Sequence, residues 1–133
     1  MIIVNPRKIK PESAVITEYQ MINADFRGKV VTVFGGTGFL GRYIVAELAA
    51  TGAVVKVITR HTQSAYFLRT SGIPGQIVPV YVSYASATEI EDVIKGSYAV
   101  VNCLGILQEH GKRANFDHIH TELPKWMAKA CAA

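Results

Sequence analysis

The clearest chemical signal in the sequence is a set of glycines that could hold a phosphate. Gly35, Gly38 and Gly41 are spaced three residues apart in VVTVFGGTGFLGRYIV, where an apolar run ends and a helical pattern begins. The first glycine permits a tight turn, the second lets the backbone approach a pyrophosphate, and the third lets the helix pack against the strand. The N–H groups at the start of the helix attract the anion. The predicted dinucleotide site comprises these glycines and the residues among them, Thr37, Phe39 and Leu40.

The end of the next apolar run indicates which dinucleotide would bind. An NAD site usually has an Asp or Glu about 20 residues after the glycines, which accepts a hydrogen bond from the ribose 2′-OH. Here no acidic residue occurs between Glu47 and Glu89, and Arg60 and His61 follow the apolar run. A guanidinium can pair with a 2′-phosphate that a carboxylate would repel. The sequence therefore predicts NADP(H) in preference to NAD(H), with Arg60 on the 2′-phosphate; an exposed loop arginine is the alternative.

Arg42 adds a cation to the first turn of the helix that follows the glycines. A cation at this end opposes the helix dipole, which makes better sense if an anion lies nearby. A solvated surface arginine and a tight turn without any ligand are the alternative interpretations of this stretch.

Strands and helices must position these residues, and the sequence from Lys29 onward alternates the two four times. Apolar runs predict strands, and the amphipathic segments after them predict helices. Strands are expected at 30–34, 53–59, 76–82 and 98–105, and helices at 39–50, 62–70, 86–95 and 116–131. Because the strands are almost continuously apolar, we expect a parallel sheet covered on both faces. The fold class is therefore α/β, a doubly wound (Rossmann) sheet of about four strands in the order 3-2-1-4.

Three further features concern the third helix, the N-terminal segment and the last strand. Ser86 and Glu89 form the pattern of a capping box at the start of the third helix. Residues 1–27 lack clear periodicity and are interpreted as an N-terminal arm, with the dinucleotide-binding unit at 28–133. The strand at 98–105 would be left as a long apolar edge unless something covers it.

Composition narrows the classes of protein. With 133 residues the chain suffices for one compact domain. The net charge of +4 is only mildly basic and the cations are scattered, so nucleic acid is not an expected partner. No apolar run approaches the roughly 20 residues that span a bilayer, and no secretory signal is recognised. Cys103 and Cys131 lack CxxC spacing and are interpreted as reduced, buried thiols of an intracellular protein.

Several phrases together resemble a known group. VFGGTGFLGRYIV, KVITR and VVNCLG resemble the extended and atypical short-chain dehydrogenase/reductase superfamily. GQIVPV, VIKGSYAVVNCLGIL and FDHIHTELPKWMAKACA resemble the NADPH-binding accessory subunits of respiratory complex I and their alphaproteobacterial relatives. The resemblance implies that the glycines hold the pyrophosphate, and that Asn102 and Gly105 lie beside the cofactor's ribose. It also implies further strands and a substrate region after this part, so we interpret the chain as the N-terminal half of a larger protein.

Two departures from the superfamily bear on function. Many relatives carry an aspartate that contacts adenine, where this sequence has Ser83 or Tyr84. The catalytic pair Tyr-x-x-x-Lys is absent, because no tyrosine here is followed four residues later by lysine. We therefore assign no catalytic residue and expect no turnover by this chain alone. His118 and His120, two apart on a predicted helix, do not face the same way, so no metal site is predicted either.

Three functions remain open from the sequence. The first is a non-catalytic NADP(H)-binding accessory subunit whose protein partners are subunits of a respiratory complex. The second is the cofactor-binding half of an NADP-dependent reductase or epimerase, partnered by its missing C-terminal half. The third is an NADP-sensing regulator. The expected location is the cytoplasm, with a peripheral place on the inner face of the bacterial plasma membrane, or on the matrix side in mitochondria, as the alternative.

Overall fold

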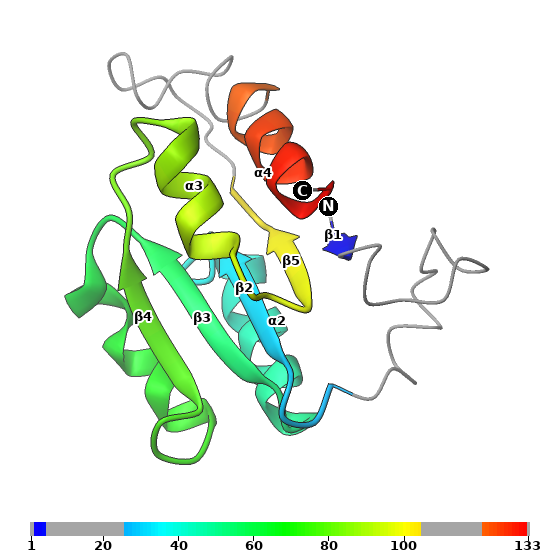
Figure 1. Cartoon of the computed structure of the whole chain (residues 1–133). Coiled ribbons are helices and arrows are strands. Elements are labelled where there is room, and N and C mark those ends of the chain that lie inside the picture. The colour runs from blue at the N-terminus through cyan, green and yellow to red at the C-terminus, as the bar shows by residue number, and fades with distance from the viewer. Residues whose placement is uncertain (1, 5–25, 105–120, 133) are drawn as a thin grey trace.

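Five strands hydrogen-bond into one sheet in the order β1-β5-β2-β3-β4 (Figure 1). The computed structural model describes residues 2–4, 26–104 and 121–132. The strands are β1 (Ile2–Val4), β2 (Val30–Phe34), β3 (Val54–Thr59), β4 (Ile77–Tyr81) and β5 (Ala99–Asn102). The last four run parallel, with β2 between β5 and β3 and with β4 beyond β3. The predicted order 3-2-1-4 is therefore confirmed.

Helices cover both faces of this sheet (Figure 1). They are α2 (Phe39–Ala50), the 3₁₀ helix η3 (Thr62–Ser71), α3 (Ala87–Ile94) and α4 (Leu123–Ala132). On one face, Val45 and Leu48 of α2 and Leu68 of η3 pack with strand residues in one buried cluster. On the other face, Ile90 of α3 and Met127 of α4 belong to a second buried cluster. This two-sided core confirms the doubly wound architecture.

The strand β1 was not predicted. It runs antiparallel to β5, with Ile2 opposite Val101 and Val4 opposite Ala99. The apolar edge at 98–105 that the sequence left open thus has a neighbour, which gives backbone groups of β5 partners in the sheet. Three residues are too few for a periodic pattern, so the sequence carried no signal for this strand. The division into an arm and a dinucleotide-binding unit stays a prediction.

The helix boundaries agree with the sequence in most places. Ser86 caps α3 as predicted, because its side-chain oxygen accepts from the Glu89 N–H at 3.3 Å. The segment after β3 is a 3₁₀ helix rather than an α-helix. The helix predicted at 116–131 appears as α4, while its first five predicted residues lie outside the described part of the chain. Among the residues that the structure describes, no helix is long and apolar enough to cross a membrane.

Candidate functional site

The glycine loop lies at the carboxyl end of the central strand β2. The chain turns between Phe34 and Phe39, and Gly35 has a φ of +76°, a conformation that glycine adopts without strain. The Gly38 N–H donates to the Gly35 carbonyl at 3.1 Å, which closes the turn. The Arg42 N–H then donates to the Gly38 carbonyl at 3.1 Å and starts the helix. The predicted strand, turn and helix are therefore all present.

The three glycines differ in what a side chain at each would meet. A Cβ on Gly35 would lie 2.7 Å from the carbonyl carbon and oxygen of Cys103. A Cβ on Gly41 would clash with the carbonyl of Gly35. On Gly38 it would meet only the Gly35 carbonyl oxygen, at 3.3 Å. Packing of the protein itself thus excludes a side chain at Gly35 and Gly41, whereas a Cβ on Gly38 would make one tight contact, with a carbonyl of its own turn.

The start of α2 suits an anion. The first turn contains no acidic residue, and Gly38 at the N-cap supplies no side-chain cap. The N–H groups of a first helical turn have no acceptor within the helix, and the helix dipole favours negative charge there. Phe39 and Leu40 are 80% and 63% exposed, and Thr37 is half-buried. These three side chains therefore line the accessible rim of the loop.

Two further predicted residues lie at the same edge of the sheet. Phe34, which ends β2, is paired with Ile58 of β3 and with Asn102 of β5. Arg60 follows β3 directly and is exposed, and Asn102 is half-buried with its Oδ1 accepting from the Leu104 N–H at 3.1 Å. The structure thus gathers the glycine loop, Arg60 and Asn102 at the carboxyl edge, where ligands of open α/β sheets bind. Gly105 lies outside the described residues.

Tyr84, one of two residues that replace the adenine-contacting aspartate, is a core residue. It is 5% exposed with a φ of +62°, and its hydroxyl donates to the Ile58 carbonyl at 3.2 Å. Its ring lies 6.2 Å from that of Phe34. Burial raises the pKa of this hydroxyl, an effect that the charge of Arg60 partly opposes. The side chain therefore packs against the carboxyl-terminal ends of β2 and β3, through Phe34 and the Ile58 carbonyl.

Ser83, the other replacement, belongs to a hydrogen-bonded loop that the sequence did not reveal. The carboxylate of Glu89 accepts from the Ser83 N–H and from the Ser83 hydroxyl, both at 2.7 Å. It also accepts from the Ala85 N–H at 3.3 Å. The capping-box pattern drew attention to Glu89, but it gave no sign that its carboxylate orders the loop after β4.

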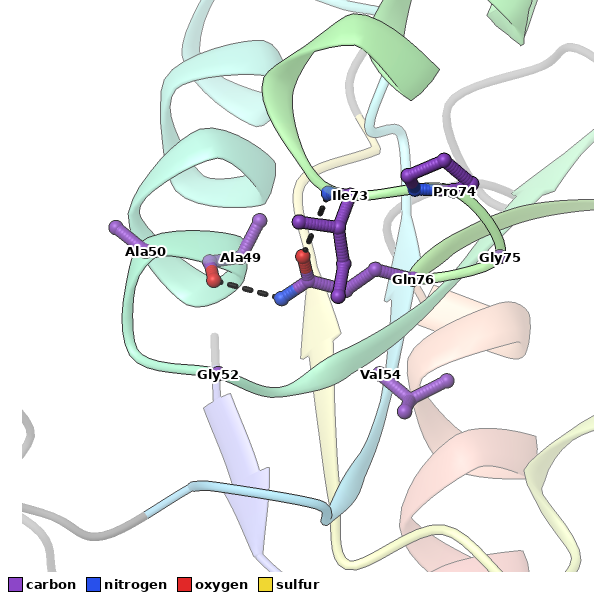
Figure 2. Close-up of a pocket in the computed structure, with 8 residues that line it drawn as sticks. All are labelled: Ala49, Ala50, Gly52, Val54, Ile73, Pro74, Gly75 and Gln76. Atoms are coloured by element: carbon purple, nitrogen blue, oxygen red, sulfur yellow. Dashed lines mark hydrogen bonds between the residues drawn. The ribbon is translucent and has the colours of Figure 1, made fainter.

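An open depression lies at the opposite, amino edge of the sheet (Figure 2). It has a volume of about 490 Å³ and lies between the end of α2 and the turn before β4. The Gln76 side chain donates to the Ala49 carbonyl at 2.7 Å and to the Ala53 carbonyl at 2.9 Å, and accepts from the Ile73 N–H at 3.1 Å. All three hydrogen bonds of the Gln76 amide go to backbone groups. We therefore interpret the residues around this depression as a structural joint and not as a second candidate site.

The surroundings of the two cysteines do not favour nucleophilic chemistry. Cys103 is half-buried and Cys131 is buried, and neither forms a disulfide. Burial raises the pKa of both thiols, which disfavours the thiolate that a nucleophile needs. Within the described ranges no group of three or more His, Cys, Asp or Glu could hold a metal ion. His118 and His120 lie outside those ranges.

Several known proteins are similar in sequence. The NADH-ubiquinone oxidoreductase 40 kDa subunit of Neurospora crassa mitochondria is 33% identical over 105 residues, which cover 79% of this chain and 28% of that protein. The mitochondrial NADH dehydrogenase [ubiquinone] 1 alpha subcomplex subunit 9 of Dictyostelium discoideum is 43% identical over 59% of this chain and 22% of its own length. The rat protein of the same name is 30% identical over 88% of this chain and 31% of its own length. The chain thus spans about a third or less of these relatives.

Solved structures agree on the fold, and a family match gives the class of protein. A metagenomic short-chain oxidoreductase in complex with NADP has a TM-score of 0.68 at 15% identity, over 80% of this chain and 56% of that one. A short-chain dehydrogenase/reductase of Serratia marcescens has a TM-score of 0.65 at 18% identity, over 81% of this chain and 51% of that one. Residues 31–132 match the NAD dependent epimerase/dehydratase family. This match covers most of the chain, including the glycine loop and all four parallel strands, and the chain belongs to that family.

Proposed function

We propose that this chain binds NADP(H) at the carboxyl edge of its sheet and serves as an accessory subunit without turnover of its own. The observation that carries the proposal is the contrast among the glycines. A Cβ on Gly35 or Gly41 would overlap the protein's own backbone, but one on Gly38 would meet only the Gly35 carbonyl oxygen, at 3.3 Å. A pyrophosphate that approaches the backbone there explains why this position has no side chain.

The residues have distinct parts in this proposal. The first-turn N–H groups of α2 would bind the pyrophosphate. Arg60 would pair with the 2′-phosphate, and Asn102 would lie beside the ribose. When bound, the nicotinamide ring supplies hydride chemistry. Support for NADP(H) over NAD(H) comes from Arg60 and from the absence of any acidic residue between Glu47 and Glu89.

The proposed accessory role is supported by the missing catalytic pair and by the names of similar proteins. A reductase of the short-chain type needs a proton donor within about 3 Å of the developing alkoxide, tuned toward neutral pH. No tyrosine in these 133 residues has a lysine four positions later. Relatives named as subunits of NADH dehydrogenase match most of the chain. We therefore propose that the protein partners are subunits of a respiratory complex, which would place the chain at the matrix side or the inner face of a membrane.

The second candidate is the cofactor-binding half of a reductase or epimerase. The observation that favours it is the family match itself, since the family description names epimerases and dehydratases. A regulator that senses NADP through the same site would share its binding behaviour. Titration with cofactor tests the shared part, and a search for turnover separates the enzyme from the other two.

The binding experiment uses the whole chain and two glycine variants. Calorimetric titration should show binding of NADPH to the unmodified protein. Gly38→Val should fold, as judged by circular dichroism, but lose binding, because its side chain stands where the pyrophosphate would approach the backbone. Gly41→Val should unfold at a lower temperature because its Cβ meets the backbone of Gly35. If Gly38→Val still binds NADPH, the loop serves only as a turn and the proposal is wrong.

A further inference from the structure

The side chain of Arg42 turns back over the glycine loop. Its Nε donates to the Gly38 carbonyl at 3.3 Å, and one Nη donates to the Thr37 carbonyl at 3.4 Å. The residue is exposed, so its side chain could instead extend into water, where the guanidinium would be fully solvated. The two hydrogen bonds nevertheless hold its charge beside the loop that would receive the cofactor.

On its other side the guanidinium meets the segment that follows Arg60. Its Cζ lies 5.5 Å from the ring centroid of Phe67 in η3. Since η3 begins at Thr62, two residues after Arg60, Arg42 bridges the glycine loop and the chain beyond β3. A ribose 2′-phosphate must lie between these two parts if the pyrophosphate occupies the start of α2 and Arg60 reaches the phosphate.

The position is electrostatically unfavourable without an anion. A cation in the first turn of a helix opposes the dipole, and α2 has no acidic residue there to balance it. The partners that the described part of the chain gives this guanidinium are two carbonyls and an aromatic ring, none of which carries a negative charge. Both hydrogen bonds are longer than the usual 2.9–3.0 Å, so little would be lost in exchanging them for a phosphate.

We propose that Arg42 is a second guanidinium for the 2′-phosphate and that, with Arg60, it determines the preference for NADP(H). The inference rests on the proposed function. Arg42 would present its planar donors from the α2 side, while Arg60 approaches from the end of β3. Two arginines around one phosphate dianion match its charge and its several acceptor oxygens. The Phe67 ring, 5.5 Å from the Arg42 Cζ, adds a cation–π contact that helps to hold the guanidinium beside the loop.

The test compares Arg42→Gln with Arg69→Gln. Arg69 is a matched control because it also lies over an aromatic ring, that of Tyr66 at 5.7 Å, near the other end of η3. The dissociation constants of NADPH and NADH are measured by calorimetry for each protein. In Arg42→Gln the constant for NADPH should rise about tenfold, the usual size of one lost charge-assisted hydrogen bond, while that for NADH changes less than about twofold. Arg69→Gln should change neither.

Other outcomes are equally informative. An equal loss for NADPH and NADH in Arg42→Gln would mean that the residue contacts the pyrophosphate or shapes the loop, which overturns the inference. No change in either constant would overturn it too, while NADPH binding by the unmodified chain would leave the proposed function standing. If the unmodified chain binds neither dinucleotide, the proposed function itself is wrong. Arg42→Lys, which keeps the charge but not the planar donors, should retain part of the NADPH preference.

Discussion

The buried hydroxyl of Tyr84 makes a sharp prediction about stability at alkaline pH. Replacing Tyr84 by Phe removes one hydroxyl that donates to the Ile58 carbonyl at 3.2 Å and keeps the ring that packs against Phe34. A hydrogen bond of this kind contributes about 0.5–1.5 kcal/mol. At pH 8 the variant should therefore have a free energy of unfolding lower than that of the unmodified protein by about this amount.

The difference should shrink as the pH rises. Burial raises the pKa of Tyr84 above its ordinary value of 10.0, so above pH 10 the unfolded chain loses this proton while the folded protein keeps it. Folding then takes up a proton, and the free energy of unfolding falls with pH by at most about 1.4 kcal/mol per pH unit. Below pH 10 both states hold the proton, and its contribution is constant. The phenylalanine variant lacks this dependence.

Urea unfolding followed by circular dichroism between pH 8 and pH 11 measures both effects. By pH 11 the advantage of the unmodified protein should have fallen by about 1.4 kcal/mol, which is enough to close or reverse the gap between the two proteins. Burial also raises the pKa of Cys103 and Cys131 and lowers that of Lys56, but these residues are present in both proteins and cancel in the difference. Tyr81→Phe is the control, since Tyr81 is 62% exposed. Parallel stability curves for the Tyr84 variant and the unmodified protein would refute the reasoning.

Three further predictions concern the two edges of the sheet and catalysis. Arg60→Asp should reverse the preference from NADPH to NADH, by about tenfold or more in the ratio of dissociation constants; equal affinities before mutation would contradict the role of Arg60. Gln76→Ala leaves the Ala49 and Ala53 carbonyls without this donor and should lower the free energy of unfolding by about 1–3 kcal/mol, with cofactor affinity unchanged in titration. In a spectrophotometric screen of aldehydes, ketones and nucleotide sugars, the chain should not oxidise NADPH; steady loss of absorbance that disappears in Gly38→Val would place it among the enzymes.

The parallel sheet and the glycine loop could be predicted because their signals are local. The strands β2 to β5 are almost continuously apolar, and the loop joins the first of them to an amphipathic helix. The placement of Arg60 at the edge of the site followed from topology alone, since parallel strands end at the same side. These features need no knowledge of contacts between distant residues.

Other features depend on contacts that no local pattern encodes. Tyr84 is buried in the core and its backbone adopts a positive φ, which a non-glycine residue rarely does. The contact of Arg42 with Phe67 joins residues on two elements that only the folded sheet brings together. The strand β1 is stabilised by its pairing with β5 rather than by its own three residues. The sequence therefore predicted a ligand site at the carboxyl edge of the sheet, but it did not predict these contacts between distant residues.

The amide of Gln76 has a consequence for how this domain tolerates change. It ties the end of α2, the start of β3 and the turn before β4 into one joint at the amino edge. The glycine loop lies at the other end of strands of five or six residues, which separates the two by about 16 Å. Substitutions this far apart usually add independently. A substitution at this amino-edge joint is therefore expected to change the stability of the domain without changing what the glycine loop at the carboxyl edge binds.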